Sequence, residues 1–363
     1  MPLHDVGYRP WRGRLRTPWA AVGVIASTGL RLAWKSRWLR RAMLFAWSPA
    51  IVFAASFFAF EQAVEEGRLT SLAERAVRGG DLDGLGMLGT IVANTLGRGD
   101  AVPPGLTEAE RLVATRRLVW TRLLLAFMRA PQAVLLAVVI GLVAPPLISR
   151  DLRAKAWLVY FTRPVGRTEY ILGKLTIVAA IVAMIAMLPA VALWLAGVLV
   201  SPSLTVGLET WDLPVRAVVA SVALAVPTVL LALAYSSLTA ESRIATFAWF
   251  ATWAACWIAH SALATADLVA AAEGPTAVAT DPGPQPAPLP GRGHWITRAA
   301  GLDPGIDRWS WISPYHAVGV VQAWVFGIET RPTAILPPLV ALATVSLVSS
   351  CVLAWRVAAP ARA

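Results

Sequence analysis

Six long apolar stretches constrain this chain more than any other feature of its sequence. A helix rises about 1.5 Å per residue, so roughly 20 residues are needed to cross the hydrocarbon core of a bilayer. The stretches are Ala42–Phe60, Pro131–Ile148, Leu175–Val200, Ala217–Ala240, Ile244–Ala266 and Ala334–Trp355. A soluble all-α core is the alternative, but it would need polar stripes at helical spacing, and these stretches are apolar all round. The sequence therefore predicts an all-α integral membrane protein with six transmembrane helices.

The distribution of positive charge predicts the orientation of these helices. Only 15% of the residues are charged, against about a quarter in soluble domains, and the formal net charge is +11. With six spans, both termini lie on one side. Lys and Arg are more than twice as dense on that side, in 1–41, 149–174, 241–243 and 356–363, as in 61–130, 201–216 and 267–333. Both termini are therefore predicted to be cytoplasmic. The charge indicates topology and attraction to anionic lipid, not nucleic-acid binding.

The predicted organisation is one transmembrane domain with short cytoplasmic ends, in a multi-pass protein of the bacterial inner or plasma membrane. The parts are a cytoplasmic segment 1–41, the six-helix domain 42–356 and a cytoplasmic tail 357–363. Within the domain, 61–130 and 267–333 are predicted to be external, and 149–174 is the one sizeable cytoplasmic loop.

Residues 22–41 have the pattern of an amphipathic helix lying on the inner leaflet. Leu30, Ala33, Trp34 and Trp38 share one face at helical spacing. The opposite side carries Arg31, Lys35, Arg37, Arg40 and Arg41. An ordinary positive flank of the first span is the alternative. A cleaved signal peptide over 1–30 is a further alternative, but no Ala-x-Ala cleavage site follows it, so a retained segment is favoured.

Both external segments contain a predicted helix. Thr107 and Glu110 have the spacing of a capping box, so a helix should begin there and run into the second span. Arg122 and Arg129 would lie on its outer portion, where they could snorkel or face a protein-lined cavity. Residues 309–328, between spans five and six, predict an interfacial or re-entrant helix; a peripheral helix packed on the external loops is the alternative.

Catalytic, metal and nucleotide motifs are mostly absent from the sequence. Six residues lie between Gly166 and Gly173-Lys174, whereas a P-loop has four between its two glycines. Leu175 also stands where a P-loop has Ser or Thr. We therefore expect no catalytic residue, no metal and no cofactor in this chain. His260 and Asp267, two helical turns apart on one face, leave a membrane-embedded enzyme as one alternative, although no hydrolase motif accompanies them. Carboxylates are missing from the span centres, which favours an external energy source over ion coupling.

The loop SRDLRAKAWLVYFTRPVGRTEYILGK, residues 149–174, resembles the cytoplasmic loop of type-2 ABC exporter permeases. In that family an acidic residue, a Gly-Thr, several hydrophobic residues, a Pro-Val-Ser-Arg-like stop and a Gly-Lys precede the third span. Asp151 is at the acidic position, and Trp157-Leu158-Val159 supply the hydrophobic residues. Arg163-Pro164-Val165-Gly166-Arg167 is similar to the stop, and Gly173-Lys174 to the end. The Gly-Thr is replaced by Lys155-Ala156. A short helix over Arg150–Phe161 would present the aromatic residues, and Pro164 would end it.

The resemblance implies a function and partners. The chain would be the permease subunit of an ATP-driven exporter of an amphiphilic or lipid-like substrate, with ATP and Mg on a separate ATP-binding subunit. It would form a homodimer or a heterodimer with a second permease chain, with spans one, two and five at the interface. Segment 22–41 would be the connecting helix, with Arg31, Trp34, Lys35 and Trp38 on the membrane surface. The residues implied to couple to the ATP-binding subunit are Asp151, Arg153, Lys155, Trp157, Leu158, Tyr160, Arg163, Pro164, Arg167, Gly173 and Lys174. A non-transporting scaffold for an ATPase is a further alternative.

Overall fold

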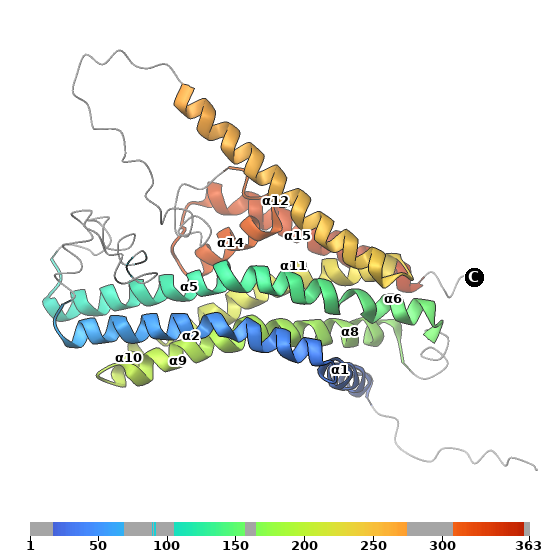
Figure 1. Cartoon of the computed structure of the whole chain (residues 1–363), viewed down its shortest axis with the longest axis horizontal. Coiled ribbons are helices and arrows are strands. Elements are labelled where there is room, and N and C mark those ends of the chain that lie inside the picture. The colour runs from blue at the N-terminus through green and yellow to red at the C-terminus, as the bar shows by residue number, and fades with distance from the viewer. Residues whose placement is uncertain are drawn as a thin grey trace, which may run out of the picture.

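The computed structural model describes residues 17–68, 89, 91, 105–156, 165–273 and 308–358, and the regular elements of these residues are all helical (Figure 1). Within these described ranges, six helical segments are long and apolar enough to cross a membrane, as many as the sequence predicts. The first, fourth, fifth and sixth segments belong to α2 (Arg37–Glu65), α11 (Asp212–Leu238), α12 (Ser242–Glu273) and α15 (Pro332–Ala358). The second combines α5 (Glu108–Val143) with α6 (Pro145–Arg153), and the third combines α8 (Arg167–Val182), the π-helix η2 (Ala183–Met187) and α9 (Leu188–Val200).

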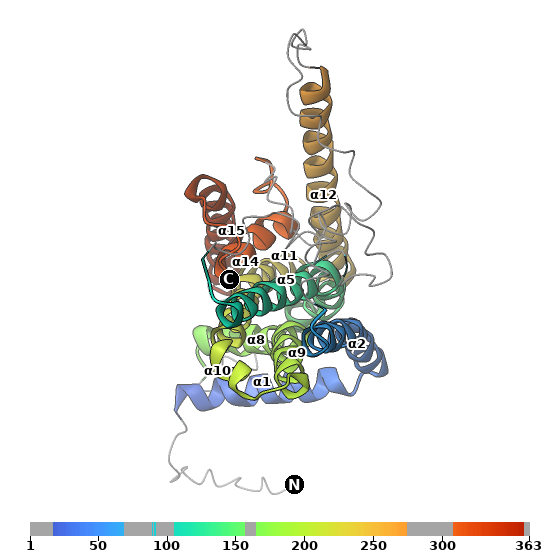
Figure 2. The same ribbon diagram turned by 90° about the vertical axis from the view of Figure 1, so that its left-hand side faces the viewer.

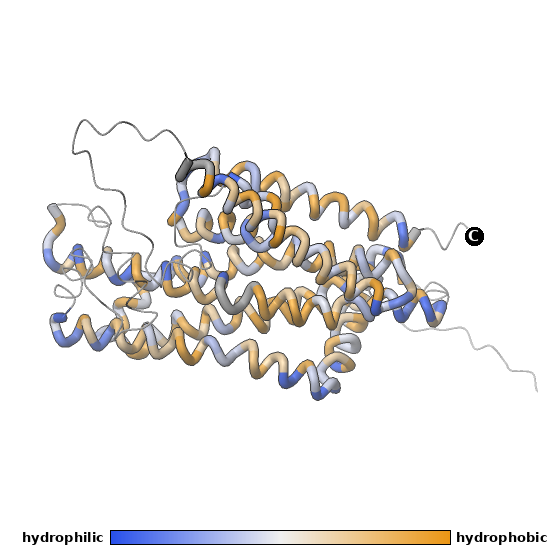
Figure 3. The backbone as a smooth tube through the Cα atoms, turned by 45° about the horizontal axis from the view of Figure 1, so that its top comes forward, coloured by the Kyte–Doolittle hydropathy of each residue, from blue (hydrophilic) through white to orange (hydrophobic). Residues whose placement is uncertain are grey.

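The bundle has two ends that we name by the elements found there. At the α6 end lie α6, the C-terminal end of α15 and the short helix α1 (Pro18–Trp34), which crosses beneath the bundle (Figures 1 and 2). At the α10 end lie α10 (Thr205–Glu209), the C-terminal end of α2 and the start of α5. Apolar residues follow the middle of the helices, and hydrophilic residues gather toward the two ends (Figure 3). This distribution is the one expected of helices surrounded by lipid.

Helix α11 is the centre of the bundle and contacts α5, α6, α8, α9, α12, α14 (Pro314–Val325) and α15. Its buried residues include small ones such as Ala217, Ala220 and Ser221. Without a hydrophobic driving force between helices in lipid, such small residues allow close backbone approach and good van der Waals contact.

Helix α5 begins well before Pro131, the first residue predicted for the second span. Thr107 and Glu110 form the predicted capping box, in which each side chain bonds the other residue's backbone N–H. However, Trp120 and Phe127 make edge-to-face contacts with Phe57 and Phe53 of α2, at 5.2 and 5.3 Å between ring centroids. The stretch that precedes Pro131 therefore lies beside the first predicted span. The boundary of the external segment 61–130 stays a prediction. Arginines interrupt the apolar run in the sequence here, whereas the fold buries them.

The third span contains a π-helical turn whose cause is Pro189. In the turn, Leu188 N–H donates a hydrogen bond to Ala183 O, five residues before it. In this register the next donor would be the N–H of residue 189, bonding Met184 O, but residue 189 is a proline and has no N–H. The indole Nε1 of Trp47 in α2 donates to Met184 O at 3.0 Å instead. The irregular turn is thereby satisfied by a neighbouring helix, as helices in lipid require.

Helices α12 and α14 form the remaining side of the bundle. From the α6 end, α12 diverges from the other helices (Figures 1 and 2), and only 11% of its most apolar stretch is buried within the chain. Helix α14 confirms a helix within 309–328, and its residues Tyr315 and Ala317–Ala323 are buried. Gln322 Nε2 approaches Ala220 O of α11 at 3.5 Å. The alternative of a helix packed only on external loops is therefore wrong, whereas its re-entrant or interfacial depth stays a prediction.

Candidate coupling site at the α6 end

The predicted loop begins at a bend between α5 and α6. Pro145 and Pro146 lack N–H groups, so the helix is interrupted at Ala144. Ser236 Oγ of α11 accepts hydrogen bonds from Ile148 N at 3.0 Å and Ser149 N at 3.2 Å, and it donates to Pro145 O. Ser149 Oγ in turn donates to Ser236 O at 2.9 Å. These buried bonds attach the start of the loop to the central helix.

The entry and exit of the loop are joined by a partly buried cluster. Lys174 Nζ lies 2.7 Å from Asp151 Oδ2 and donates to Leu147 O at 2.8 Å. Tyr170 Oη donates to the same carboxylate oxygen at 2.8 Å. The Lys174 side chain is 10% exposed and that of Asp151 19%. Asp151 and Lys174, two of the predicted coupling residues, thus bind each other and close the base of the loop.

The fold divides the predicted loop helix. Helix α6 ends at Arg153, and Lys155 has φ +50°, a left-handed conformation that a non-glycine residue seldom adopts. A continuous helix over Arg150–Phe161 is therefore wrong. Arg153 is exposed and pairs with Glu241 at 3.2 Å, and Lys155 and Arg167 are also exposed. Trp157, Leu158, Tyr160, Arg163 and Pro164 lie outside the described residues, so their docking role stays a prediction.

Helix α1 packs on α8 through two glycines. A Cβ on Gly173 would lie 2.6 Å from Cγ2 of Ile25, and a Cβ on Gly29 would overlap the Ile177 side chain. Both glycines permit a backbone approach that larger residues would prevent. Gly173 is thus buried under α1, and the glycine pair is a signal of close helix contact that the sequence interpretation missed.

The predicted amphipathic segment is two helices rather than one. Helix α1 ends at Trp34, and Ser36 caps α2 by accepting a hydrogen bond from Leu39 N. Trp38 therefore belongs to the first transmembrane helix, and a single helix over 22–41 is wrong. Arg31, Trp34, Lys35 and Trp38 are all exposed, which leaves them free for the predicted contact with the membrane surface.

His260 and Asp267 do not form a catalytic pair. Asp267 accepts hydrogen bonds from Arg308 at 2.6 and 2.9 Å and from Trp309 Nε1 at 2.9 Å. The His260 ring stacks on His316, with 3.5 Å between ring centroids. Asp267 binds Arg308 and Trp309, whereas His260 stacks on His316, so the two residues are not arranged as an acid–base pair. No metal-binding group of three His, Cys, Asp or Glu occurs in the described ranges.

Six apolar helical segments and a helix across one end define a multi-pass helical membrane protein. Residues 40–355 of the chain match the family described as ABC-2 family transporter protein, and the chain belongs to that family. It is thus a transporter of the permease type, as the loop 149–174 indicated. None of the curated proteins compared with the sequence matches it.

Proposed function

We propose that this chain is the permease subunit of an ATP-driven exporter, which receives work from a separate ATP-binding subunit at its α6 end. The subunit would dock on loop 149–174 and on α1. ATP-driven closure of two such subunits, beneath a dimer of permease chains, would switch the chains between two access states.

The Asp151–Lys174 cluster carries this proposal. It joins α6 to α8 at the base of the loop, so a push on the loop reaches both transmembrane segments together. Gly173 lies beside Lys174 and packs against Ile25, which adds α1 to the same unit. Ser236 extends the connection to α11. A loop held in this way transmits force, whereas a loop free at its base would absorb it.

The charge at the α6 end supports its assignment to the cytoplasm. Among the described residues of this end, Lys and Arg outnumber Asp and Glu several-fold, and the acids are Asp151, Glu169 and Glu241. Short basic segments are retained on the cytoplasmic side. The apolar helices, with few charges facing lipid, favour an amphiphilic or lipid-like cargo.

The test is to co-purify the chain with a candidate ATP-binding subunit from the same genome and to measure ATP hydrolysis. The variant Trp157→Ala/Leu158→Ala/Arg163→Ala should lose most co-purification and any stimulation of hydrolysis by the permease. A control triple variant at the α10 end, Leu204→Ala/Leu208→Ala/Trp211→Ala, removes exposed apolar surface far from the loop and should retain both.

Equal behaviour of the two triple variants would exclude coupling through the loop. A scaffold that only binds the ATPase would keep complex formation but move nothing. Reconstituted vesicles carrying a fluorescent lysophospholipid distinguish the two functions, because only a transporter changes its leaflet distribution when ATP is added.

A further inference from the structure

Arg129 is a buried cation inside the second transmembrane segment. Arg117 pairs with Asp212 at the start of α11, and Ser149 bonds Ser236 near its end, so α5–α6 and α11 run side by side between these contacts. Arg129 lies 12 residues from Arg117 and 20 from Ser149, or about 18 and 30 Å along the helix. It is only 5% exposed. An arginine at such a depth is costly and is a functional candidate by default.

Two other arginines of α5 have acidic partners, whereas Arg129 forms no ion pair among the described residues. Arg116 forms a bidentate pair with Glu61 at 3.0 and 3.1 Å, and Arg117 lies 2.7 Å from Asp212. The ion pairs of the described residues do not include Arg129. Its Nε is buried and has no hydrogen-bond partner. Within the part of the chain that the structure describes, no acidic side chain therefore compensates the charge of Arg129, and a guanidinium cannot become neutral by losing its proton.

The surroundings of Arg129 are suited to a negative group. Its guanidinium lies against Gly319 of α14, where a Cβ would overlap it, and its Cζ is 5.7 Å from the centroid of the Tyr315 ring. His316 follows Tyr315, and its Nδ1 is buried without a hydrogen-bond partner. Burial, the stacked His260 and the charge of Arg129 lower the pKa of His316 to about 3, so this ring is neutral at physiological pH.

Tyr315 and His316 lie in the first turn of α14, which has no side-chain cap. The backbone N–H groups of a first turn carry partial positive charge and favour anions. Three features thus lie close together: the Arg129 cation, the N-terminus of α14 and the neutral His316 ring, whose buried Nδ1 has no hydrogen-bond partner. The aromatic ring of Tyr315 offsets only part of the positive charge of Arg129.

From this arrangement we propose that Arg129, with Tyr315 and His316 of α14, binds a phosphate or carboxylate group of a ligand within the bundle. If the proposed export function holds, this group belongs to the cargo, and the cargo is an anionic amphiphile. The side formed by α12 offers the route of entry. Trp257 and His260 of α12 cover His316, at 5.5 and 3.5 Å between ring centroids, and α12 is otherwise little packed.

The experiment measures equilibrium binding to the full-length chain in phosphatidylcholine nanodiscs, with three radiolabelled probes. These are 1-oleoyl lysophosphatidate, monoolein, which has the same acyl chain and glycerol without the phosphate, and inorganic phosphate. We expect saturable binding of lysophosphatidate and none of monoolein. Arg129→Gln should weaken binding about tenfold or more, since it removes a charge-assisted hydrogen bond. Arg117→Gln, which removes one charge from the same helix, should change binding less than about twofold.

The thermal stability of the variants separates binding from a structural role. Because Arg129 is buried without an acidic partner, Arg129→Gln should leave the unfolding temperature unchanged or raise it. A residue kept for structure would lower it. If Arg129→Gln does not fold, Gly319→Ala replaces it, since the added methyl displaces the guanidinium without changing the charge.

Three results overturn the proposal: lysophosphatidate binding that is unaffected by Arg129→Gln or Gly319→Ala, equal binding of monoolein, and no binding of either anion. Arg129-dependent binding of lysophosphatidate alone supports an amphiphile, and Arg129-dependent binding of inorganic phosphate supports a small free anion at the same site. The assay contains no ATP and no partner subunit. A failure here therefore differs from a failure of the proposed export function, which the ATPase measurement detects.

Discussion

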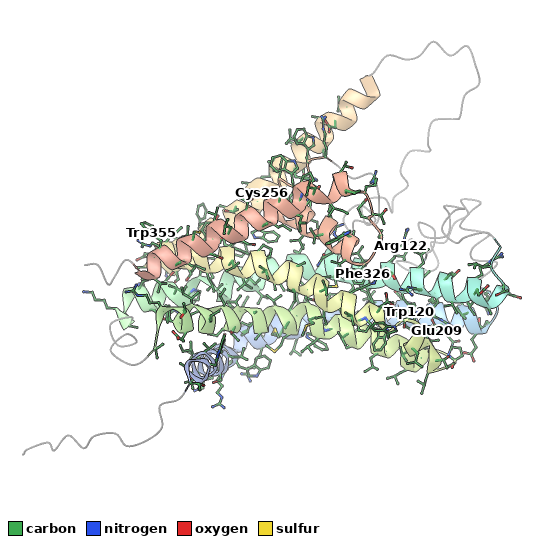
Figure 4. The ribbon with its side chains drawn as sticks, turned by 180° about the vertical axis from the view of Figure 1, so that it is seen from behind. Trp120, Arg122, Glu209, Cys256, Phe326 and Trp355 are labelled. Atoms are coloured by element: carbon green, nitrogen blue, oxygen red, sulfur yellow. The ribbon has the colours of Figure 1, made fainter. Side chains whose placement is uncertain are left out.

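At the scale of single residues, the function of a charged side chain in this protein depends on what it pairs with. Lys174 follows a glycine as in a nucleotide-binding loop, and its position before a span is compatible with snorkelling. The fold gives it another role, because Asp151, Tyr170 and Leu147 surround it. Trp120 illustrates the same dependence at the α10 end (Figure 4), where its Nε1 donates to Glu61 at 3.1 Å.

Lys174→Met should lower the free energy of unfolding by about 3 kcal/mol, because it leaves the Asp151 carboxylate partly buried without its cation. Unfolding by sodium dodecyl sulfate in mixed micelles measures the change. Lys155→Met is the matched control: its side chain is exposed, and we expect a change within about 0.5 kcal/mol. Equal effects of the two substitutions would contradict the structural role of the pair.

At the scale of elements, irregularities appear where one helix must fit another. Near the bend at Ala144, Ser236 Oγ accepts a hydrogen bond from Ile148 N–H, and in η2 the Trp47 indole N–H bonds the carbonyl of Met184. Glycines leave the space in which α1 packs closely on α8. In each case the neighbouring helix supplies the bond or the space that the irregular segment lacks. Sequence periodicity describes one helix at a time and gives no such information.

Gly173→Ala should separate α1 from α8, since its Cβ would lie 2.6 Å from Cγ2 of Ile25. We expect a loss of about 1–3 kcal/mol in the free energy of unfolding, as for other overpacked contacts. Coupling should also weaken, seen as reduced stimulation of ATP hydrolysis. Gly23→Ala adds the same methyl to the exposed side of α1, where nothing lies within 4 Å, and should leave both measurements unchanged.

At the scale of the whole molecule, the bundle is asymmetric in charge and in packing. The α6 end is basic, whereas the α10 end contains the acidic partners Glu61 and Asp212. Trp355 lies toward the α6 end, and Trp120 and Glu209 lie toward the α10 end (Figure 4). This asymmetry predicts the orientation in the membrane.

Labelling of single cysteines in whole cells tests that orientation. In a background with Cys256→Ser and Cys351→Ser, Ser203→Cys at the α10 end should react with a membrane-impermeant maleimide in intact cells. Arg167→Cys at the α6 end should react only after permeabilisation. Both native residues are exposed positions, so accessibility within the protein is comparable. The reverse pattern would show that the orientation deduced from positive charge is wrong.

The sequence by itself determined the six spans, the start of α5 at Thr107–Glu110 and the family resemblance of loop 149–174. These features depend on local properties: hydropathy over about 20 residues, a four-residue cap and the order of residues in one loop. The tertiary structure decided the rest. The burial of Arg129, the pairing of Lys174 with Asp151 and the contact of α5 with α2 all depend on which helices lie side by side. In the sequence alone, Arg129 indicates the end of an apolar span. In the structure, α14 packs against its side chain and encloses it in protein, and sequence periodicity does not show which helix lies next to another.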